Sequence, residues 1–278
     1  MRPEEYRAMY AVEDDHWWYA GMRRVADTLL AARFAGDRGS LAVLDAGCGT
    51  GGNSAHLRAY GQVTGIDFSA AALDFARERP GIRLAQASVE SLPFADDSFD
   101  LVLSNDVLCH LGVASDATAM QEFARVLRPG GVLFLQLPAY QWLRSHHDEA
   151  VHTTHRYTAG ELRGLIAGAG LRIRRVTHAN GLLLPVAAVW RGLDRVRAAR
   201  AQRAERSDVR PVLGPVNALM RTVLGLEAPL LAKRNLPFGL SVIGVAEKAQ
   251  AATRFSAPRA CEPRREAAVS ARRSSVTA

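Results

Sequence analysis

The chain has few cysteines and no long apolar run, and both absences narrow the class of protein. Its 278 residues include three cysteines, Cys48, Cys109 and Cys261, which lie far apart and form no C-x-x-C pair. This pattern argues against a disulfide framework or a thiolate metal site and favours a reducing compartment. No run reaches the roughly 18 apolar residues of a membrane-spanning helix. The acidic, aromatic first residues lack the apolar region of a secretory signal, so we expect a cytoplasmic protein.

Positive charge is concentrated in two segments. Residues 250–278 contain six Arg and two Glu, and residues 191–210 contain seven Arg and three acidic residues, so each segment carries a net charge of +4. The whole chain has a formal net charge of +7, so the remainder is nearly neutral. A neutral body with basic appendages is not typical of a domain that binds a phosphate backbone along one face. We therefore expect no nucleic-acid partner.

Short apolar runs alternate with amphipathic segments of helical period, which predicts an α/β fold with a parallel, doubly wound, Rossmann-like sheet. The expected strands are Leu41–Ala46, Gln62–Ile66, Ile82–Ala85, Phe99–Ser104, Val132–Leu137, Leu171–Val176 and Leu240–Ala246. The expected helices include Asn53–Tyr60, Ala70–Arg79, Ala117–Leu127 and Ala159–Ala169.

The order of these segments predicts a core with three appendages. We expect an N-terminal helical cap over residues 1–38, a core over 39–180, an insertion over 181–237, the last strand of the core within 238–248, and a basic, disordered tail over 249–278. The insertion has apolar ends and a basic centre. It suits either a helical cover over the sheet edge or an element on a membrane surface, so peripheral membrane contact through 181–237 is one of our expectations.

The stretch VLDAGCGTGG, residues 43–52, predicts a ligand-binding turn between a strand and a helix. Gly47, Gly49 and Gly52 fit the dinucleotide fingerprint G-x-G-x-x-G, whereas Gly47, Gly49 and Gly51 fit G-x-G-x-G. Glycines let the backbone approach a ligand closely in both cases. The glycines alone therefore leave the choice of ligand open.

Two carboxylates bear on that choice. Asp67, twenty residues after Gly47, is placed to accept hydrogen bonds from ribose hydroxyls in either interpretation. Asp45, in front of the glycines, would repel the pyrophosphate of a dinucleotide and attract a ligand that carries an ammonium and a sulfonium. S-adenosylmethionine is such a ligand, and we expect it as the cofactor.

Four stretches in order, VLDAGCGTGG, VTGIDFSAAALDFAR, SVESLPFADDSFDLVLSNDVLCHL and FARVLRPGGVLFLQLP, closely resemble the motifs of class I S-adenosylmethionine-dependent methyltransferases. The resemblance covers residues 41–176. It implies a mostly parallel sheet with an antiparallel last strand, and a methyltransferase activity.

The resemblance also implies roles for individual residues. Asp45, Gly47, Gly49 and Gly51 would contact the methionine end of the cofactor, and Asp67 its ribose. Phe68 would flank the adenine, Ser88 and Val89 would meet the adenine edge, and Asn105 would lie where cofactor and acceptor meet. Ser88 stands where many relatives have Asp. For Asn105, capping of the next helix is an alternative.

Segments outside the core resemble a narrower bacterial subgroup, the type 11-like methyltransferases. They are HWWY at residues 16–19, Arg23-Arg24, HDE at residues 147–149 and RYT at residues 156–158. The later segment departs from the subgroup pattern, because Thr153 stands where an inner His is expected and His155 where an Arg is expected. The resemblance implies a lid over the acceptor.

A hydroxyl acceptor must lose its proton during methyl transfer, which directs attention to histidines near the carboxyl edge of the sheet. His147, oriented by Asp148, is the first candidate base and His110 the second. Four histidines lie within residues 146–155, but without cysteine partners we expect no metal.

We expect O-methylation of a small-molecule, sugar or lipid-linked acceptor by in-line methyl transfer. The alternatives are methylation of nitrogen, carbon or a macromolecule, and a nucleotide-binding protein without this activity, such as an NAD-dependent oxidoreductase.

Overall fold

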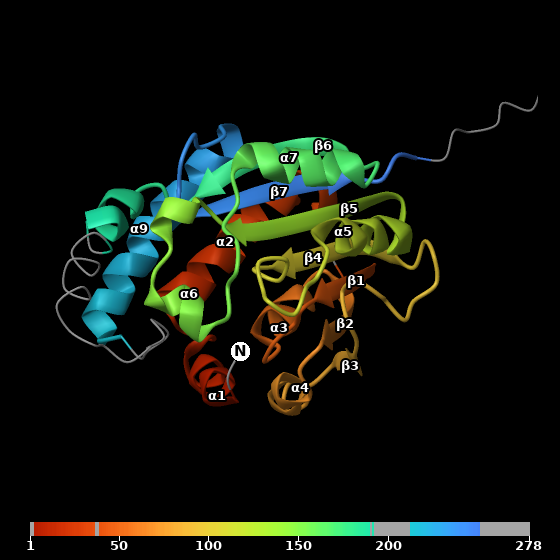
Figure 1. The fold of residues 1–278 in the computed structure, drawn as a ribbon, viewed down its shortest axis with the longest axis horizontal. Coiled ribbons are helices and arrows are strands. Elements are labelled where there is room, and N and C mark those ends of the chain that lie inside the picture. The colour runs from red at the N-terminus through yellow and green to blue at the C-terminus, as the bar shows by residue number, and fades with distance from the viewer. Residues whose placement is uncertain (1–2, 37–38, 190, 192–211, 251–278) are drawn as a thin grey trace, which may run out of the picture.

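The computed structural model describes residues 3–36, 39–189, 191 and 212–250, and it contains a seven-stranded sheet of order β3-β2-β1-β4-β5-β7-β6 (Figure 1). The strands are β1 Leu41–Ala46, β2 Gly61–Asp67, β3 Ile82–Gln86, β4 Phe99–Asn105, β5 Leu127–Pro138, β6 Arg172–Ala179 and β7 Ser241–Glu247. Strands β1 to β5 pair in parallel, and β7 runs antiparallel to both β5 and β6. The predicted fold class is confirmed, including the antiparallel last strand.

Helices cover both faces of the sheet (Figure 1). They are α1 Pro3–Val12, α2 Trp17–Phe34, α3 Gly52–Leu57, α4 Ala70–Ala76, α5 Asp116–Val126, α6 His146–Ala150, α7 Ala159–Gly168 and α9 Gly214–Lys233, with a 3-10 turn at Gln141–Leu143. Ser69, Ser115 and Thr158 cap α4, α5 and α7, since each side chain accepts a hydrogen bond from an amide of the first turn. None of the helices within the described ranges is both long and apolar enough to cross a membrane.

The core lies in two layers because the central strands are buried on both faces. On β5, Leu133 and Leu135 face the layer that contains Phe123 of α5 and Ile166 of α7. Phe134 points to the other layer, together with residues of α2 and α9. Such strands read as continuous apolar runs, which is why the sequence located them closely.

The predicted insertion contributes a long helix, α9, which packs on α2. The contact is close at Gly21, where an added Cβ would lie 2.4 Å from Cδ1 of Leu224. Asn217 ties the same two helices together: its Oδ1 accepts from the amide of Trp17 at 2.7 Å, and its Nδ2 donates to the carbonyl of Asp15 at 2.9 Å. The basic centre of the insertion, 192–211, and the tail from 251 onward lie outside the described residues.

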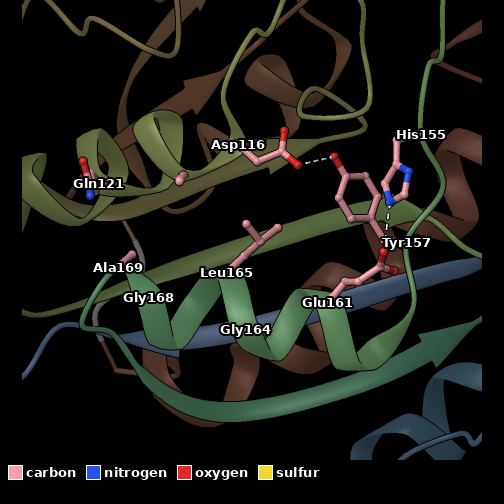
Figure 2. A pocket seen from close by; sticks show the side chains of 10 residues that line it. Asp116, Gln121, His155, Tyr157, Glu161, Gly164, Leu165, Gly168 and Ala169 are labelled. Atoms are coloured by element: carbon pink, nitrogen blue, oxygen red, sulfur yellow. Dashed lines mark hydrogen bonds and ion pairs between the residues drawn. The ribbon is translucent and has the colours of Figure 1, made fainter.

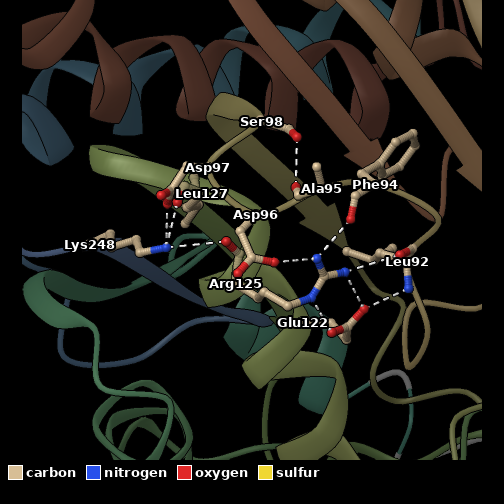
Figure 3. Close-up of polar contacts among 10 residues, drawn as sticks. All are labelled: Leu92, Phe94, Ala95, Asp96, Asp97, Ser98, Glu122, Arg125, Leu127 and Lys248. Carbon is tan, nitrogen blue, oxygen red and sulfur yellow. Dashed lines mark hydrogen bonds and ion pairs between the residues drawn. The ribbon is translucent and has the colours of Figure 1, made fainter.

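A polar cluster closes the amino edge of the sheet (Figure 3). The Arg125 guanidinium donates to the carbonyls of Leu92 and Phe94, at 3.0 and 2.7 Å, and pairs with Glu122. Lys248, directly after β7, donates to the carboxylate of Asp97 at 2.8 Å. These contacts fix the loop before β4 at the edge opposite to the strand ends where ligands bind in such folds.

Candidate active site

A cavity of about 1010 Å³ runs along the carboxyl edge of the sheet. Its wall includes residues that follow β1, β2, β3, β4 and β5, and its outer side is formed by α1, α2, segment 148–156, segment 183–187, Arg191 and α9. Ligands of open α/β sheets bind outside the carboxyl ends of the strands, which is where this cavity lies.

Asp67 and Phe68 form one end of the cavity. The Asp67 carboxylate is fixed by two backbone amides, with Oδ2 accepting from Gly49 at 2.9 Å and Oδ1 from Ser69 at 2.8 Å. Each oxygen keeps acceptor capacity for a ribose hydroxyl. Phe68 is 72% exposed beside it and offers a ring face to a planar base. Ser88 and Val89 also line this end.

The glycine loop passes close to its neighbours. Gly47, Gly49 and Gly51 have φ values of 85°, 54° and 85°, in the left-handed region that favours glycine. A Cβ on Gly47 would lie 2.2 Å from Cγ2 of Val107. Gly47 and Gly49 line the cavity, whereas Gly51 is the N-cap residue of α3 and packs near Ala76 of α4. The loop thus offers two of the three expected glycines directly to a ligand.

Asp45 lies behind this loop and is not part of the cavity wall. It is 1% exposed, and the hydroxyl of Ser54 donates to its Oδ2 at 2.5 Å. Burial raises the pKa of Asp45 to about 7. A role toward the methionine end of the cofactor stays a prediction, and the structure limits it to an effect of charge from behind the glycines.

A polar group at the ends of β4 and β5 marks the middle of the cavity. Asn105 pairs in register with Gln136, and Asp106 follows directly with a φ of 54°. The Gln136 amide donates to Oδ2 of Asp106 at 2.8 Å. Oδ1 of Asn105 and Oε1 of Gln136 are buried with no hydrogen-bond partner among the described residues. The two atoms have almost no accessible surface, so only other atoms of these two residues can meet a ligand in the cavity.

Asp106 and Gln136 are functional candidates that the sequence analysis did not single out. Both line the cavity, and burial raises the pKa of Asp106 to about 6. A side chain other than glycine at positive φ is uncommon, although Asp tolerates it better than most. The available signal was an acidic residue directly after a buried strand. The contact with Gln136, thirty residues on, is visible only in the structure.

The structure describes the side chains of two of the three predicted catalytic residues, Asp148 and His110. Asp148 lines the cavity, but its carboxylate binds Arg156, with Nε to Oδ1 at 2.9 Å and Nη2 to Oδ2 at 3.1 Å. His147 belongs to α6, and its side chain lies outside the described part of the structure. His110 lines the cavity, and burial lowers its pKa to about 4. The roles of His147 and His110 as bases stay predictions.

The N-terminal cap of α1 and α2 meets the cofactor end of the cavity at the turn between the two helices. Glu13, between α1 and α2, accepts from the Thr50 hydroxyl at 2.5 Å and forms an ion pair with Arg79 at 2.8 Å. Trp17, Trp18 and Tyr19 line the cavity. Glu13 therefore holds this cap directly against the glycine loop.

A second, smaller cavity of about 380 Å³ lies between α5 and α7 (Figure 2). Tyr157 donates to Asp116 at 2.8 Å, and Nε2 of His155 lies 3.2 Å from Oε1 of Glu161. The segment that was expected to form a lid is thus divided, because Arg156 and Thr153 line the large cavity while His155 and Tyr157 line the small one. Among the side chains that the structure describes, no three His, Cys, Asp or Glu residues gather as metal ligands.

Comparison with known proteins identifies the family. A methyltransferase domain family matches residues 44–135. A probable S-adenosylmethionine-dependent methyltransferase of Mycolicibacterium smegmatis is 30% identical over 183 residues, which are 63% of this chain and 68% of that protein. The chain belongs to the class I S-adenosylmethionine-dependent methyltransferases. Its cofactor is S-adenosylmethionine, and the Asp67 carboxylate and the Phe68 ring fit that molecule.

Other relatives of this methyltransferase match over shorter stretches. A malonyl-[acyl-carrier protein] O-methyltransferase of Enterobacter lignolyticus is 45% identical over 113 residues, 40% of this chain and 43% of that protein. The chain spans less than half the length of the curated relatives of that name from Enterobacter, Pectobacterium and Erwinia billingiae. Among solved structures, the [4+2]-cyclase SpnF has a TM-score of 0.52 and 22% identity and covers 82% of this chain and 81% of its own, a likeness of fold.

Proposed function

We propose that this methyltransferase transfers the methyl group of S-adenosylmethionine to an oxygen of a small-molecule, sugar or lipid-linked acceptor. The observation that supports this most is the continuity of the large cavity. One space joins the cofactor residues Gly49 and Asp67 to the polar group of Asn105, Asp106 and Gln136. A nucleophile bound at that polar group would approach the cofactor without leaving the cavity.

Methyl transfer is an in-line displacement, so the protein mainly has to align the nucleophile and exclude water. When bound, S-adenosylmethionine supplies a methyl group on a positively charged sulfur. Asp67 and the glycine loop hold the cofactor, and the cap fixed by Glu13 covers it from solvent. Asn105, Asp106 and Gln136 give the middle of the cavity a polar wall against which the acceptor would be oriented.

The proton of a hydroxyl acceptor requires a base, and the cavity offers several groups. Asp106, with its pKa raised to about 6, is largely ionised at neutral pH and accepts a proton more readily than an ordinary carboxylate. His110, with its pKa lowered to about 4, is neutral but weakly basic. Asp148 binds Arg156, so we assign it a positioning role. We propose Asp106 as a candidate base, in addition to His147.

The second part of the proposal concerns the insertion. On α9, Val216, Leu219, Leu226 and Leu230 recur at intervals of three, seven and four and are all exposed. Seven arginines occur in residues 191–210, which border this helix in the sequence. An exposed apolar face next to a basic segment suits peripheral contact with an anionic membrane surface.

Calorimetric titration tests the cofactor part of the proposal. We expect S-adenosylhomocysteine to bind at micromolar concentrations and NAD not to bind measurably. Tighter binding of NAD would overturn the assignment.

The transfer itself is tested by release of S-adenosylhomocysteine in the presence of hydroxyl, amine and carboxyl acceptors. Turnover with amines alone would favour N-methylation over the proposed O-methylation.

A further inference from the structure

The wall of the large cavity changes character along the sheet edge. The cofactor residues lie at the carboxyl ends of β1, β2 and β3, and the polar group lies at the carboxyl ends of β4 and β5. Next in the sheet is β7, whose first residue, Ser241, pairs with Pro138 and also lines the cavity. The wall contributed by α2, segment 183–187 and α9 is mainly apolar and consists of Trp17, Trp18, Tyr19, Met22, Leu183, Val186, Ala187 and Met220, with Arg191 lining the cavity beyond this segment.

The size of the cavity leaves room for a second molecule beside the cofactor. Pockets for one drug-sized ligand occupy roughly 300–1,000 Å³, and this single cavity has about 1010 Å³. Asp67 lies beyond β1, on the side of β4 away from β7. The apolar section therefore lies on the acceptor side of the polar group.

Specific contacts hold the apolar wall in place. Both carboxylate oxygens of the buried Glu227, on α9, accept backbone hydrogen bonds at 2.7 Å, from the amides of Asn180 and Leu182. These bonds fix the chain as it leaves β6 and enters segment 183–187. Together with the contacts of Asn217 and Leu224 to α2, they make this section a built part of the fold.

The apolar section opens to solvent beside an apolar rim. Val186 lines the cavity and is also 67% exposed. Val189 is exposed on the same side of the helical residues 184–189, three positions after Val186, and Leu182 is exposed in the turn before them. A hydrocarbon chain that is longer than the cavity could leave it over this rim without meeting a charged group among these three residues.

We infer that the acceptor is an amphiphile, with its nucleophilic polar end at Asn105, Asp106 and Gln136 and an extended hydrocarbon chain between α2, segment 183–187 and α9. The inference deepens the proposed function and rests on it only for the methyl transfer to the polar end. Each buried methylene of such a chain should raise the affinity about fourfold, until the chain reaches the mouth at Val186.

Binding of 1-alkanols with four to twelve carbons tests this inference. The probes are titrated into the protein saturated with S-adenosylhomocysteine and followed by the fluorescence of Trp17 and Trp18, which line the cavity. We expect the affinity to rise about fourfold per methylene and then to level off. Affinities that do not depend on chain length would overturn the inference.

Three variants test where the hydrocarbon chain of the probes lies. Ala187→Phe should shorten the range of chain lengths over which affinity rises, because the ring fills part of the apolar section. Val186→Asp should weaken only the longest probes, which reach the mouth. Leu219→Asp is the matched control, since Leu219 is an exposed apolar residue of the same insertion that does not line the cavity. Equal effects of the two Asp substitutions would contradict the proposed path.

The affinity for S-adenosylhomocysteine is measured in every variant. It distinguishes a failure of the amphiphilic acceptor from a failure of the proposed function. Normal cofactor binding without any dependence on chain length would refute the amphiphilic acceptor and leave the proposed function standing. A failure to bind S-adenosylhomocysteine would refute the proposed function. Titration of the alkanols without cofactor would then still report on the apolar section.

Discussion

Arg156 and Asp148 form a two-point ion pair in the wall of the large cavity, and both side chains are almost fully buried, at 6% and 2% exposure. Nη1 of Arg156 also donates to the carbonyl of Ala139 at 3.1 Å. The pair thus joins segment 148–156 to the chain that follows β5. It sets the position of α6, where His147 lies.

Removal of one member of this pair should be costly. Arg156→Leu is expected to lower the free energy of unfolding by about 3–5 kcal/mol, because it leaves the Asp148 carboxylate buried without its cation. The double variant Arg156→Leu, Asp148→Leu should be more stable than Arg156→Leu alone. Urea unfolding measures both. Arg77→Leu, which breaks an exposed pair with Asp74, is the control and should cost about 0–1 kcal/mol. Similar losses for Arg156→Leu and Arg77→Leu would contradict the argument.

Asp67→Asn should weaken cofactor binding while it preserves the shape of the site. The amide oxygen can still accept one of the backbone hydrogen bonds, but the charged acceptor for the ribose is lost. We expect affinity for S-adenosylhomocysteine to fall about tenfold to a hundredfold in calorimetry. Asp74→Asn, on the exposed side of α4, controls for the change in net charge. An unchanged affinity of Asp67→Asn would remove Asp67 from the ribose site.

Asp106→Asn tests the proton acceptor. If Asp106 is the base, wild-type turnover should rise with pH through about 6 as the carboxylate ionises. The variant should lose about 10²–10⁴-fold in turnover and lose this rise, with nearly normal affinity for the cofactor. Release of S-adenosylhomocysteine with any acceptor that the wild type methylates provides the measurement. If Asp106→Asn keeps the rise and His147→Ala removes it, the base is His147.

Asp45→Asn should stabilise the protein more at high pH than at low pH. Because burial raises the folded-state pKa of Asp45 to about 7 from an ordinary value of 3.8, the folded protein holds this proton more tightly than the unfolded chain. Wild-type stability should therefore be greatest below the unfolded pKa and fall as pH rises toward 7.

The variant lacks this titration. The difference in unfolding free energy between Asp45→Asn and wild type should grow by about 3 kcal/mol from pH 5 to pH 8, since one pKa unit corresponds to about 1.4 kcal/mol. Denaturant curves without cofactor at both pH values give this quantity. Parallel pH profiles for the two proteins would show that Asp45 does not titrate as described.

The exposed face of α9 should mediate peripheral membrane binding. We expect the protein to sediment with vesicles that contain anionic lipid and to be released by salt. The double variant Leu219→Asp, Leu226→Asp should bind much less. Ala218→Asp, an exposed position that is not three, four or seven residues from Leu219 or Leu226, controls for added charge. Equal binding to neutral vesicles would indicate simple hydrophobic adsorption.

The sequence predicted the parts of this molecule that depend on local pattern. All seven expected strands were found, and the clearest, β1, β4 and β7, are mainly apolar runs that are buried on both faces of the sheet. Asp67 and the glycines Gly47 and Gly49 line the cavity as expected, since their spacing follows from one strand, one turn and the next strand. These features could be predicted without knowing which residues meet across the fold.

The remaining features arise from pairing across the fold. Asp106 meets Gln136 only because β4 and β5 are neighbours in a particular register. Asp148 was expected to orient His147, but a longer, planar cation, Arg156, reaches it from eight residues away. The apolar residues of the insertion read as a cover or a membrane face, and their contribution to the cavity wall depends on how α9 packs on α2.

The contact between Gly21 and Leu224 makes the width of this cavity depend on two residues that substitutions can change. Neither residue lines the cavity, yet they set the spacing of α2 and α9, which supply part of its wall. Even the methyl group of alanine at position 21 would require the Leu224 side chain or the helix that carries it to shift. The range of molecules that the enzyme accommodates can therefore evolve, or be engineered, through a helix spacing that is set away from any residue that touches them.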